Sequence, residues 1–245
     1  MKTYQVHLIR HGLTEGNLKG QYIGQTNVPL SSRGINDLHN LAKNFTYPTA
    51  DFYYTSPLLR CIQTMSILYP HTDFFEVPGL AEVNFGDWEG KTAQDLAGDP
   101  NFAQWLEMGG SISPPNGESN GEFVRRTCEA FENLVDNMMK TKTYSSVIVA
   151  HGGTIMTLLA AYGLPRANFY DWMTEAGHGY SLRVTPSLWM SGRVVEVYDT
   201  IPTSKAAKNV QSTESDERLI IDVGREAANR AYGTESESPA QDDDE

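Results

Sequence analysis

Residues 8–17 read LIRHGLTEGN, and in this stretch a short apolar run stops abruptly at Arg10, His11 and Gly12. The run belongs to a longer β-rich segment at 3–9, which predicts a buried strand. A buried strand that ends on a guanidinium beside an imidazole has two interpretations. The two polar residues can begin a solvent-facing loop, or they can form part of a site at the edge of a sheet.

Short β-rich runs alternate with longer segments whose apolar residues recur every three or four positions. The β-rich runs lie at 3–9, 52–55, 145–150, 180–185 and 192–200, and the helical patterns at 35–45, 57–69, 121–140 and 153–163. This order predicts βαβ units, so we expect an α/β fold: a three-layer α/β/α sandwich around a mostly parallel sheet. The last two runs are close in sequence and predict a hairpin, which would place an antiparallel strand at one edge.

The composition indicates one domain of catalytic size followed by an acidic tail. The chain has 245 residues, 40% of them hydrophobic and 20% charged, with a formal net charge of −12. Residues 203–245 contain eleven acidic and five basic residues, so half of the net charge lies there. We therefore predict a catalytic domain at 1–202 and a mobile tail at 203–245. Within the tail, residues 215–233 either form a short amphipathic helix or stay solvated.

The sequence argues against several other classes of protein. Cys61 and Cys128 show no metal-ligand spacing, so we expect neither a disulfide framework nor a zinc site. The apolar run near the N-terminus is too short for a signal peptide or a membrane span, and we expect a cytoplasmic protein without a membrane partner. An acidic chain without a basic stripe is a poor candidate for binding duplex nucleic acid. The oligomeric state is left open.

Four polar clusters, three of them directly after predicted strands, lie at residues 10–12, 55–64, 81–90 and 150–154. In open parallel sheets, ligands bind beyond the carboxyl ends of the strands, so we expect these clusters at one edge. Each cluster alone has an ordinary interpretation. The glycines that follow the strand at 145–150 can serve a turn, Arg60 can pair with an acid, and Glu82 can be a surface carboxylate.

Together the clusters predict a pocket for a dianion. They bring His11 and His151 to the same edge of the sheet as Arg10 and Arg60. Arginine presents a planar fork that matches phosphate oxygens, and it stays charged at any relevant pH. A phosphoryl group is the natural occupant, because an aldehyde or an amide would not call for so much positive charge.

Six motifs occur along the chain in a distinctive order: LIRHGLTEGN, GQTNVPLSSRG, YTSPLLRCIQT, LAEVNFGDWEG, PPNGES and VAHGGTIMTLL. With them the chain resembles the histidine phosphatase superfamily, in its phosphoglycerate-mutase-like branch. The resemblance extends from about Tyr4 to about Thr200. It departs from the pattern of many phosphatase members at Asn27, where they carry Asp, and at Met156, where they carry Arg.

The resemblance implies a role for each site residue. His11 is the nucleophile and becomes a phosphohistidine, Glu82 is the proton donor, and the phosphate is held by Arg10, Asn17, Arg60 and His151. Cationic neighbours depress the pKa of His11, as attack by a neutral imidazole requires. His151 stabilises phosphate oxygens best as a cation, so we expect the two histidines to differ in protonation. No metal and no cofactor is implied.

The predicted activity is hydrolysis of phosphomonoesters, with small phosphorylated metabolites as substrates. The form EVNFGDWEG favours a phosphatase, and two alternatives stay open: mutase-type phosphoryl transfer, and a non-catalytic scaffold that binds a phosphorylated ligand. The loop-rich segment 92–122 is typical of an insertion over a binding face. Its residues Phe102, Trp105 and Met108 can line the pocket or belong to the core.

Overall fold

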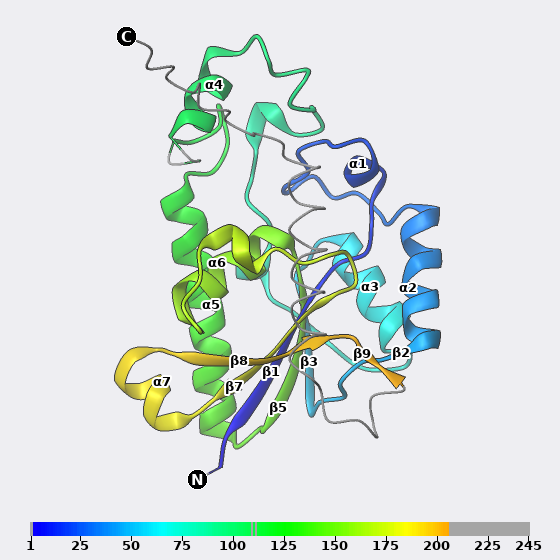
Figure 1. The fold of residues 1–245 in the computed structure, drawn as a ribbon, viewed down its shortest axis with the longest axis vertical. Coiled ribbons are helices and arrows are strands. Elements are labelled where there is room, and N and C mark those ends of the chain that lie inside the picture. Colours follow the sequence, from blue (N-terminus) through cyan, green and yellow to red (C-terminus); the bar gives the residue numbers. More distant parts are fainter. Residues whose placement is uncertain (1, 109, 111, 206–245) are drawn as a thin grey trace, which may run out of the picture. The chain divides into compact units, whose positions relative to one another are not determined.

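The chain folds around a seven-stranded sheet, in a computed structural model that describes residues 2–108, 110 and 112–205. The strand order is β4-β3-β5-β1-β7-β8-β6 (Figure 1). The strands of this sheet are β1 (Tyr4–Arg10), β3 (Phe52–Thr55), β4 (Phe75–Glu76), β5 (Ser145–Ala150), β6 (Gly163–Leu164), β7 (Gly179–Val184) and β8 (Val195–Ile201). A separate two-stranded pair joins β2 (Phe45–Thr46) to β9 (Thr203–Ser204).

Helices cover both faces of the sheet, with α2 and α3 on one face and α5 and α6 on the other (Figure 1). The α-helices are α1 (Glu15–Leu18), α2 (Ser32–Asn44), α3 (Leu59–Leu68), α4 (Pro100–Glu107), α5 (Asn120–Thr141), α6 (Gly152–Tyr162) and α7 (Pro186–Gly192). Short 3₁₀ turns are η1 (Pro78–Leu80), η2 (Gly86–Trp88) and η3 (Phe169–Trp172). The predicted three-layer α/β/α fold is confirmed.

One detail of the predicted sheet is corrected. The strands β1, β3, β4 and β5 are parallel, and β7 is antiparallel to both of its neighbours, β1 and β8. The antiparallel strand therefore lies inside the sheet and not at its edge, because β8 and β6 follow it. The sequence pattern missed β6, since two residues directly after a helix are too short to show an alternation.

The two central strands, β1 and β5, are buried on both faces, because their apolar residues pack into two separate hydrophobic cores. In β1, Val6 and Leu8 pack towards α5 and α6, whereas Ile9 packs towards α2 and α3. In β5, Ile148 packs towards α5 and α6, whereas Val149 packs towards α2 and α3. A strand with nearly continuous apolar character is the pattern of a covered, parallel sheet, in which successive side chains point to opposite faces.

The long helix α5 begins at a capping box and buries one stripe of side chains. The hydroxyl of Ser119 accepts a hydrogen bond from the backbone N–H of Glu122, and the Glu122 carboxylate accepts one from the N–H of Ser119. Its buried residues recur at helical spacing: Phe123, Thr127, Phe131, Val135 and Met138. This stripe faces the sheet and leaves the opposite side of α5 polar.

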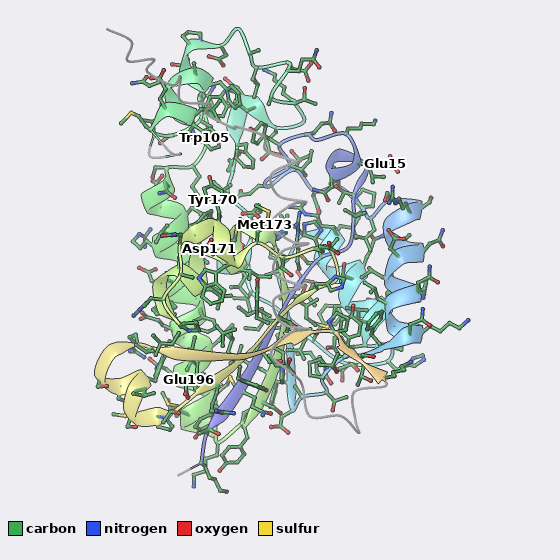
Figure 2. The ribbon with its side chains drawn as sticks, in the orientation of Figure 1. Glu15, Trp105, Tyr170, Asp171, Met173 and Glu196 are labelled. Carbon is green, nitrogen blue, oxygen red and sulfur yellow. The ribbon has the colours of Figure 1, made fainter. Side chains whose placement is uncertain are left out.

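The segment at 92–122 contains its own small core. Phe102 is buried with Trp88 and Leu96, and Trp105 packs partly against them. Figure 2 shows Trp105 on α4, among the side chains of this cluster. Phe102 is thus a core residue, and Met108 is exposed at 48%.

The predicted boundary at 202/203 stays a prediction. The described chain continues across it as β9, whose first residue is Thr203. The predicted mobile tail from residue 206 onward, including the possible helix at 215–233, lies outside the described residues. Within the described part of the chain, no helix is long and apolar enough to cross a membrane.

The buried His7 of β1 is expected to make folding sensitive to acid. Its Nδ1 lies 2.9 Å from the hydroxyl of Ser181, and burial lowers its pKa from 6.5 to about 4. The unfolded chain therefore binds a proton more readily between those values, so stability is present above pH 6.5 and is lost as the pH falls towards 4. The loss between pH 7 and pH 5 should be about 2 kcal/mol.

Chemical denaturation of His7→Gln at both pH values should show a flatter pH dependence than the wild type. The exposed His39 supplies the control, because His39→Gln should keep the wild-type slope. An unchanged slope in His7→Gln would show that this histidine does not couple folding to pH.

Candidate active site

The register of two parallel strands, β1 and β5, brings the two histidines of the site together. Arg10 of β1 pairs with Ala150 of β5, and the ladder continues past the strand ends through the N–H of His11, which donates to the Ala150 carbonyl at 3.0 Å. His151 follows directly. The two imidazole rings meet edge to face, with centroids 5.1 Å apart. The predicted juxtaposition of His11 and His151 is thus present in the fold.

A single hydrogen bond determines the tautomer of His11. Its Nδ1 lies 2.7 Å from the carbonyl oxygen of Gly12. Because a carbonyl can only accept, Nδ1 carries the proton and Nε2 keeps a lone pair. Burial, followed by the charges of Arg60 and Arg10, lowers the pKa of His11 well below its usual range. The imidazole is therefore neutral, and Nε2 can act as a nucleophile.

Arg60, on the first turn of α3, lies against that nitrogen. Its Nε is 3.3 Å from Nε2 of His11. Its other nitrogens donate to the carbonyl oxygens of Thr26 at 3.0 Å and Gly24 at 2.6 Å. Carbonyl oxygens satisfy the donors but carry no formal charge. In the described part of the chain no carboxylate forms an ion pair with Arg60, so its positive charge stays available to an anion.

The loop that holds Arg60 is itself held by Glu89. The Glu89 carboxylate accepts hydrogen bonds from the backbone N–H groups of Gly24, Gln25 and Thr26 at 2.9 to 3.3 Å. The Thr26 hydroxyl donates to the same carboxylate at 2.6 Å. A side chain at residue 24 would place its Cβ 1.8 Å from the carbonyl oxygen of Val83, so this close approach requires glycine. Sequence reasoning missed Glu89, because its partners lie more than sixty positions earlier in the chain.

Arg10 presents a donor that nothing in the described protein accepts. Its Nη1 donates to the carbonyl of Thr174 at 2.6 Å, just after the residues Tyr170, Asp171 and Met173 that Figure 2 labels. Its Nε is buried and has no hydrogen-bond partner. An unsatisfied buried donor costs free energy, so its presence favours a site that a ligand oxygen completes.

His151 is fully buried and oriented by a serine. Its Nε2 lies 2.7 Å from the hydroxyl of Ser56, and the thiol of Cys61 lies 3.5 Å from the same nitrogen. Burial, with the charges of His11, Arg60 and Arg10, lowers the pKa of His151 well below its usual range. The pKa values of His11 and His151 are thus shifted in the same direction, and the protein's own groups do not produce the expected difference in protonation.

Glu82 meets α6 at its first turn. Its Oε2 accepts from the N–H of Gly153 at 3.0 Å, and its Oε1 from the N–H of Val83 at 2.9 Å. Burial outweighs these bonds and raises the pKa of the carboxyl. A Cβ at residue 153 would lie 2.5 Å from Oε1, so the close approach depends on glycine. A carboxyl with a raised pKa is suited to donate a proton near neutral pH.

Asn17 is placed differently from the other candidates. Its Oδ1 accepts from the backbone N–H and the hydroxyl of Thr14, at 3.0 and 2.9 Å, and so completes the cap of α1. These contacts tie it to the first turn of α1 and not to the histidine pair.

The two departures from the family pattern have structural positions. Asn27 accepts from the N–H of Leu59 at 2.7 Å, which satisfies a free donor at the start of the helix that carries Arg60. Met156 of α6 is half-buried against the core.

The arrangement can bind and attack a tetrahedral dianion. It combines an imidazole nitrogen with a lone pair, two guanidinium groups that have no carboxylate partner among the described residues, and a carboxyl whose pKa is raised. Among residues 2–108, 110 and 112–205, no cluster of three or more His, Cys, Asp or Glu side chains could hold a metal ion.

Comparison with known proteins identifies the family. The family model of the histidine phosphatase superfamily (branch 1) matches residues 6–196. The chain is 30% identical over 175 residues to the adenosylcobalamin/alpha-ribazole phosphatase of Salmonella typhimurium, covering 69% of this chain and 85% of that protein. It is 27% identical over 159 residues to a 2,3-bisphosphoglycerate-dependent phosphoglycerate mutase of Cytophaga hutchinsonii, covering 62% of this chain and 74% of that protein. The solved alpha-ribazole phosphatase of Shigella flexneri matches with a TM-score of 0.69 at 25% identity, covering 85% of this chain and 100% of that one. The chain belongs to the histidine phosphatase superfamily.

Proposed function

We propose that the protein hydrolyses small phosphorylated metabolites through a phosphohistidine on Nε2 of His11. The observation that carries the proposal is the lone pair of that nitrogen, which lies 3.3 Å from Nε of Arg60, a guanidinium with no carboxylate partner in the described chain. A nucleophile next to an uncompensated cation suits attack on a group that is itself negatively charged, because the cation offsets the repulsion.

The reaction proceeds in two steps. Nε2 of His11 attacks phosphorus, the bond between phosphorus and the leaving oxygen breaks, and Glu82 gives its proton to that oxygen. Water then attacks the phosphohistidine while Glu82 takes one of its protons. The phosphorus–nitrogen bond breaks, inorganic phosphate leaves, and both residues return to their starting states.

The phosphate oxygens are held by four side chains in this proposal: Arg10, Asn17, Arg60 and His151. Arg10 contributes its unpartnered Nε. Asn17 contributes its Nδ2, because its Oδ1 already accepts from Thr14. A bound dianion raises the pKa of His151 and favours its cationic form, so the difference between the two histidines arises on substrate binding.

The Salmonella typhimurium relative is named as a phosphatase and the Cytophaga hutchinsonii relative as a mutase, so phosphoryl transfer to a second acceptor is the alternative. Water as acceptor is favoured by the phosphatase-like motif at residues 82–90, EVNFGDWEG. We further propose cytoplasmic action on a small-molecule partner, with neither nucleic acid nor membrane bound, and catalysis without a cofactor.

His11→Ala is expected to abolish turnover of phosphomonoesters, because it removes the imidazole nitrogen whose lone pair lies against the Arg60 guanidinium. Rapid quenching of the wild type with labelled substrate should trap phosphate on His11. His39→Ala, at an exposed histidine, should keep full turnover. Label on a different residue, or none in an enzyme that turns over, would refute the covalent mechanism. Transfer of the label to glycerate phosphates in place of water would favour the mutase alternative.

Glu82→Gln is expected to lower kcat/KM for alkyl phosphates about a hundredfold or more, since a poor leaving group needs a proton from the enzyme. Aryl phosphates, whose leaving groups are stable as anions, should lose much less. The pKa of Glu82 is raised, so the wild-type rate on alkyl phosphates should fall as the pH rises through that value. This limb should disappear in Glu82→Gln. Equal losses of kcat/KM on alkyl and aryl phosphates would show that Glu82 is not the general acid.

Turnover is expected to survive EDTA, because arginine and histidine side chains supply the charge that a divalent ion supplies in other phosphoryl-transfer sites. The measurement compares enzyme dialysed against chelator with untreated enzyme, followed by readdition of magnesium or zinc. Loss of activity that a divalent ion restores would contradict metal independence.

A further inference from the structure

Arg126 is not among the residues proposed to act on the substrate. Every N–H donor of its guanidinium has an acceptor. It lies on α5, and its five N–H groups make five hydrogen bonds. Three go to the backbone carbonyls of Gly79, Ala81 and Glu82, at 3.1, 2.7 and 2.9 Å. Two go to the carboxylate of Glu118, at 2.6 and 2.8 Å. A guanidinium has five donors in a fixed plane, so this arrangement sets the position of each acceptor around it.

The backbone that Arg126 holds is the segment that carries Glu82. This segment runs from η1 into the residues after it and belongs to no strand, so no sheet ladder fixes its carbonyls. Two further hydrogen bonds join Asn84 to Glu118. The N–H of Asn84 donates to the Glu118 carboxylate at 3.3 Å, and the N–H of Glu118 donates to the Asn84 carbonyl at 2.9 Å. A Cβ at Gly79 would lie 2.6 Å from that of Ala130, so glycine allows the segment to lie directly on α5.

The net charge of this arrangement is close to zero, because Arg126 and Glu118 form a bidentate ion pair whose side chains are 21% and 13% exposed. This distinguishes Arg126 from Arg10 and Arg60, which offer unpaired charge to a ligand. Its direct effect on the reaction is therefore geometric. The Glu82 carboxyl must reach both the N–H of Gly153 and the leaving oxygen, and a displacement of its backbone would break that alignment.

We infer that Arg126, fixed by Glu118, is the positioning residue for Glu82. Its hydrogen bonds to residues 79–82 take the place of the strand pairing that this segment lacks. They hold the Glu82 carboxyl in position to give its proton to the leaving oxygen. The inference rests on the proposed function and adds a residue that acts through Glu82 without touching substrate.

The test compares leaving groups in variants of the full chain. Arg126→Lys keeps the charge but cannot span five acceptors, and Glu118→Gln keeps the shape of the partner but removes its charge. Arg125→Lys is the matched control, because the neighbouring Arg125 is exposed and, within the described chain, forms its ion pair with Glu129 on the same helix face. The readout is the ratio of kcat/KM for an alkyl phosphate to kcat/KM for 4-nitrophenyl phosphate. Both substrates are measured on one sample, so the ratio does not depend on how much of the variant folds.

Arg126→Lys and Glu118→Gln should lower this ratio by about tenfold or more, and Arg125→Lys should leave it unchanged. In a Glu82→Gln background, Arg126→Lys should no longer change the ratio, since the residue acts through the carboxyl that has been removed. Equal losses on both substrates, or a change in the ratio that persists without the Glu82 carboxyl, would overturn the inference. Failure of the proposed function is distinguishable, because the wild type would then show no phosphohistidine or no dependence on Glu82.

Discussion

Burying a guanidinium away from carboxylates is costly unless each of its N–H groups finds an acceptor. Arg60 meets this condition in part, because each of its three nitrogens donates one hydrogen bond, two to backbone carbonyls and one to Nε2 of His11. Those carbonyls belong to a loop whose N–H groups converge on Glu89. The backbone of this loop thus separates the carboxylate of Glu89 from the guanidinium of Arg60. The positive charge of Arg60 stays beside His11 without a carboxylate partner in the described chain.

Burial is the main cause of the shifted pKa values at the site, and the surrounding charges modify it. Both histidines lie among cations in a buried setting, so their pKa values fall and both imidazoles are neutral. Glu82 is buried too, and its pKa moves upward for the same reason. These shifts favour a neutral imidazole at His11 and the protonated form of the Glu82 carboxyl. A dianion would bring the missing negative charge.

Much of the fold could be predicted because its signals are local. Residues 147–150 are apolar on both faces, as a covered parallel strand requires, and α5 shows its buried stripe in the spacing from Phe123 to Met138. The pairing of His11 with His151 could be anticipated because each follows a predicted strand of one sheet. The interior place of β7 could not, since the sequence pattern of a hairpin does not show which of its two strands pairs with β1.

The residues that support the site were harder to find. Glu89 and Arg126 are ordinary surface residue types in the sequence, and their roles arise from backbone groups that only the folded chain brings near. The protonation of His151 likewise depends on the sum of burial and surrounding charge. Phe102 was left undecided between pocket and core, because an aromatic at helical spacing fits both, and its packing on Trp88 decides for the core.

A crystal structure with bound orthovanadate, which mimics the transferring phosphoryl group, tests the central claim most directly. The predicted result is vanadium bonded to Nε2 of His11, with its oxygens within hydrogen-bond distance of Nε of Arg10 and of the guanidinium of Arg60. Vanadate bound elsewhere, or bound at this edge of the sheet without a bond to His11, would contradict a nucleophile prepared by uncompensated positive charge.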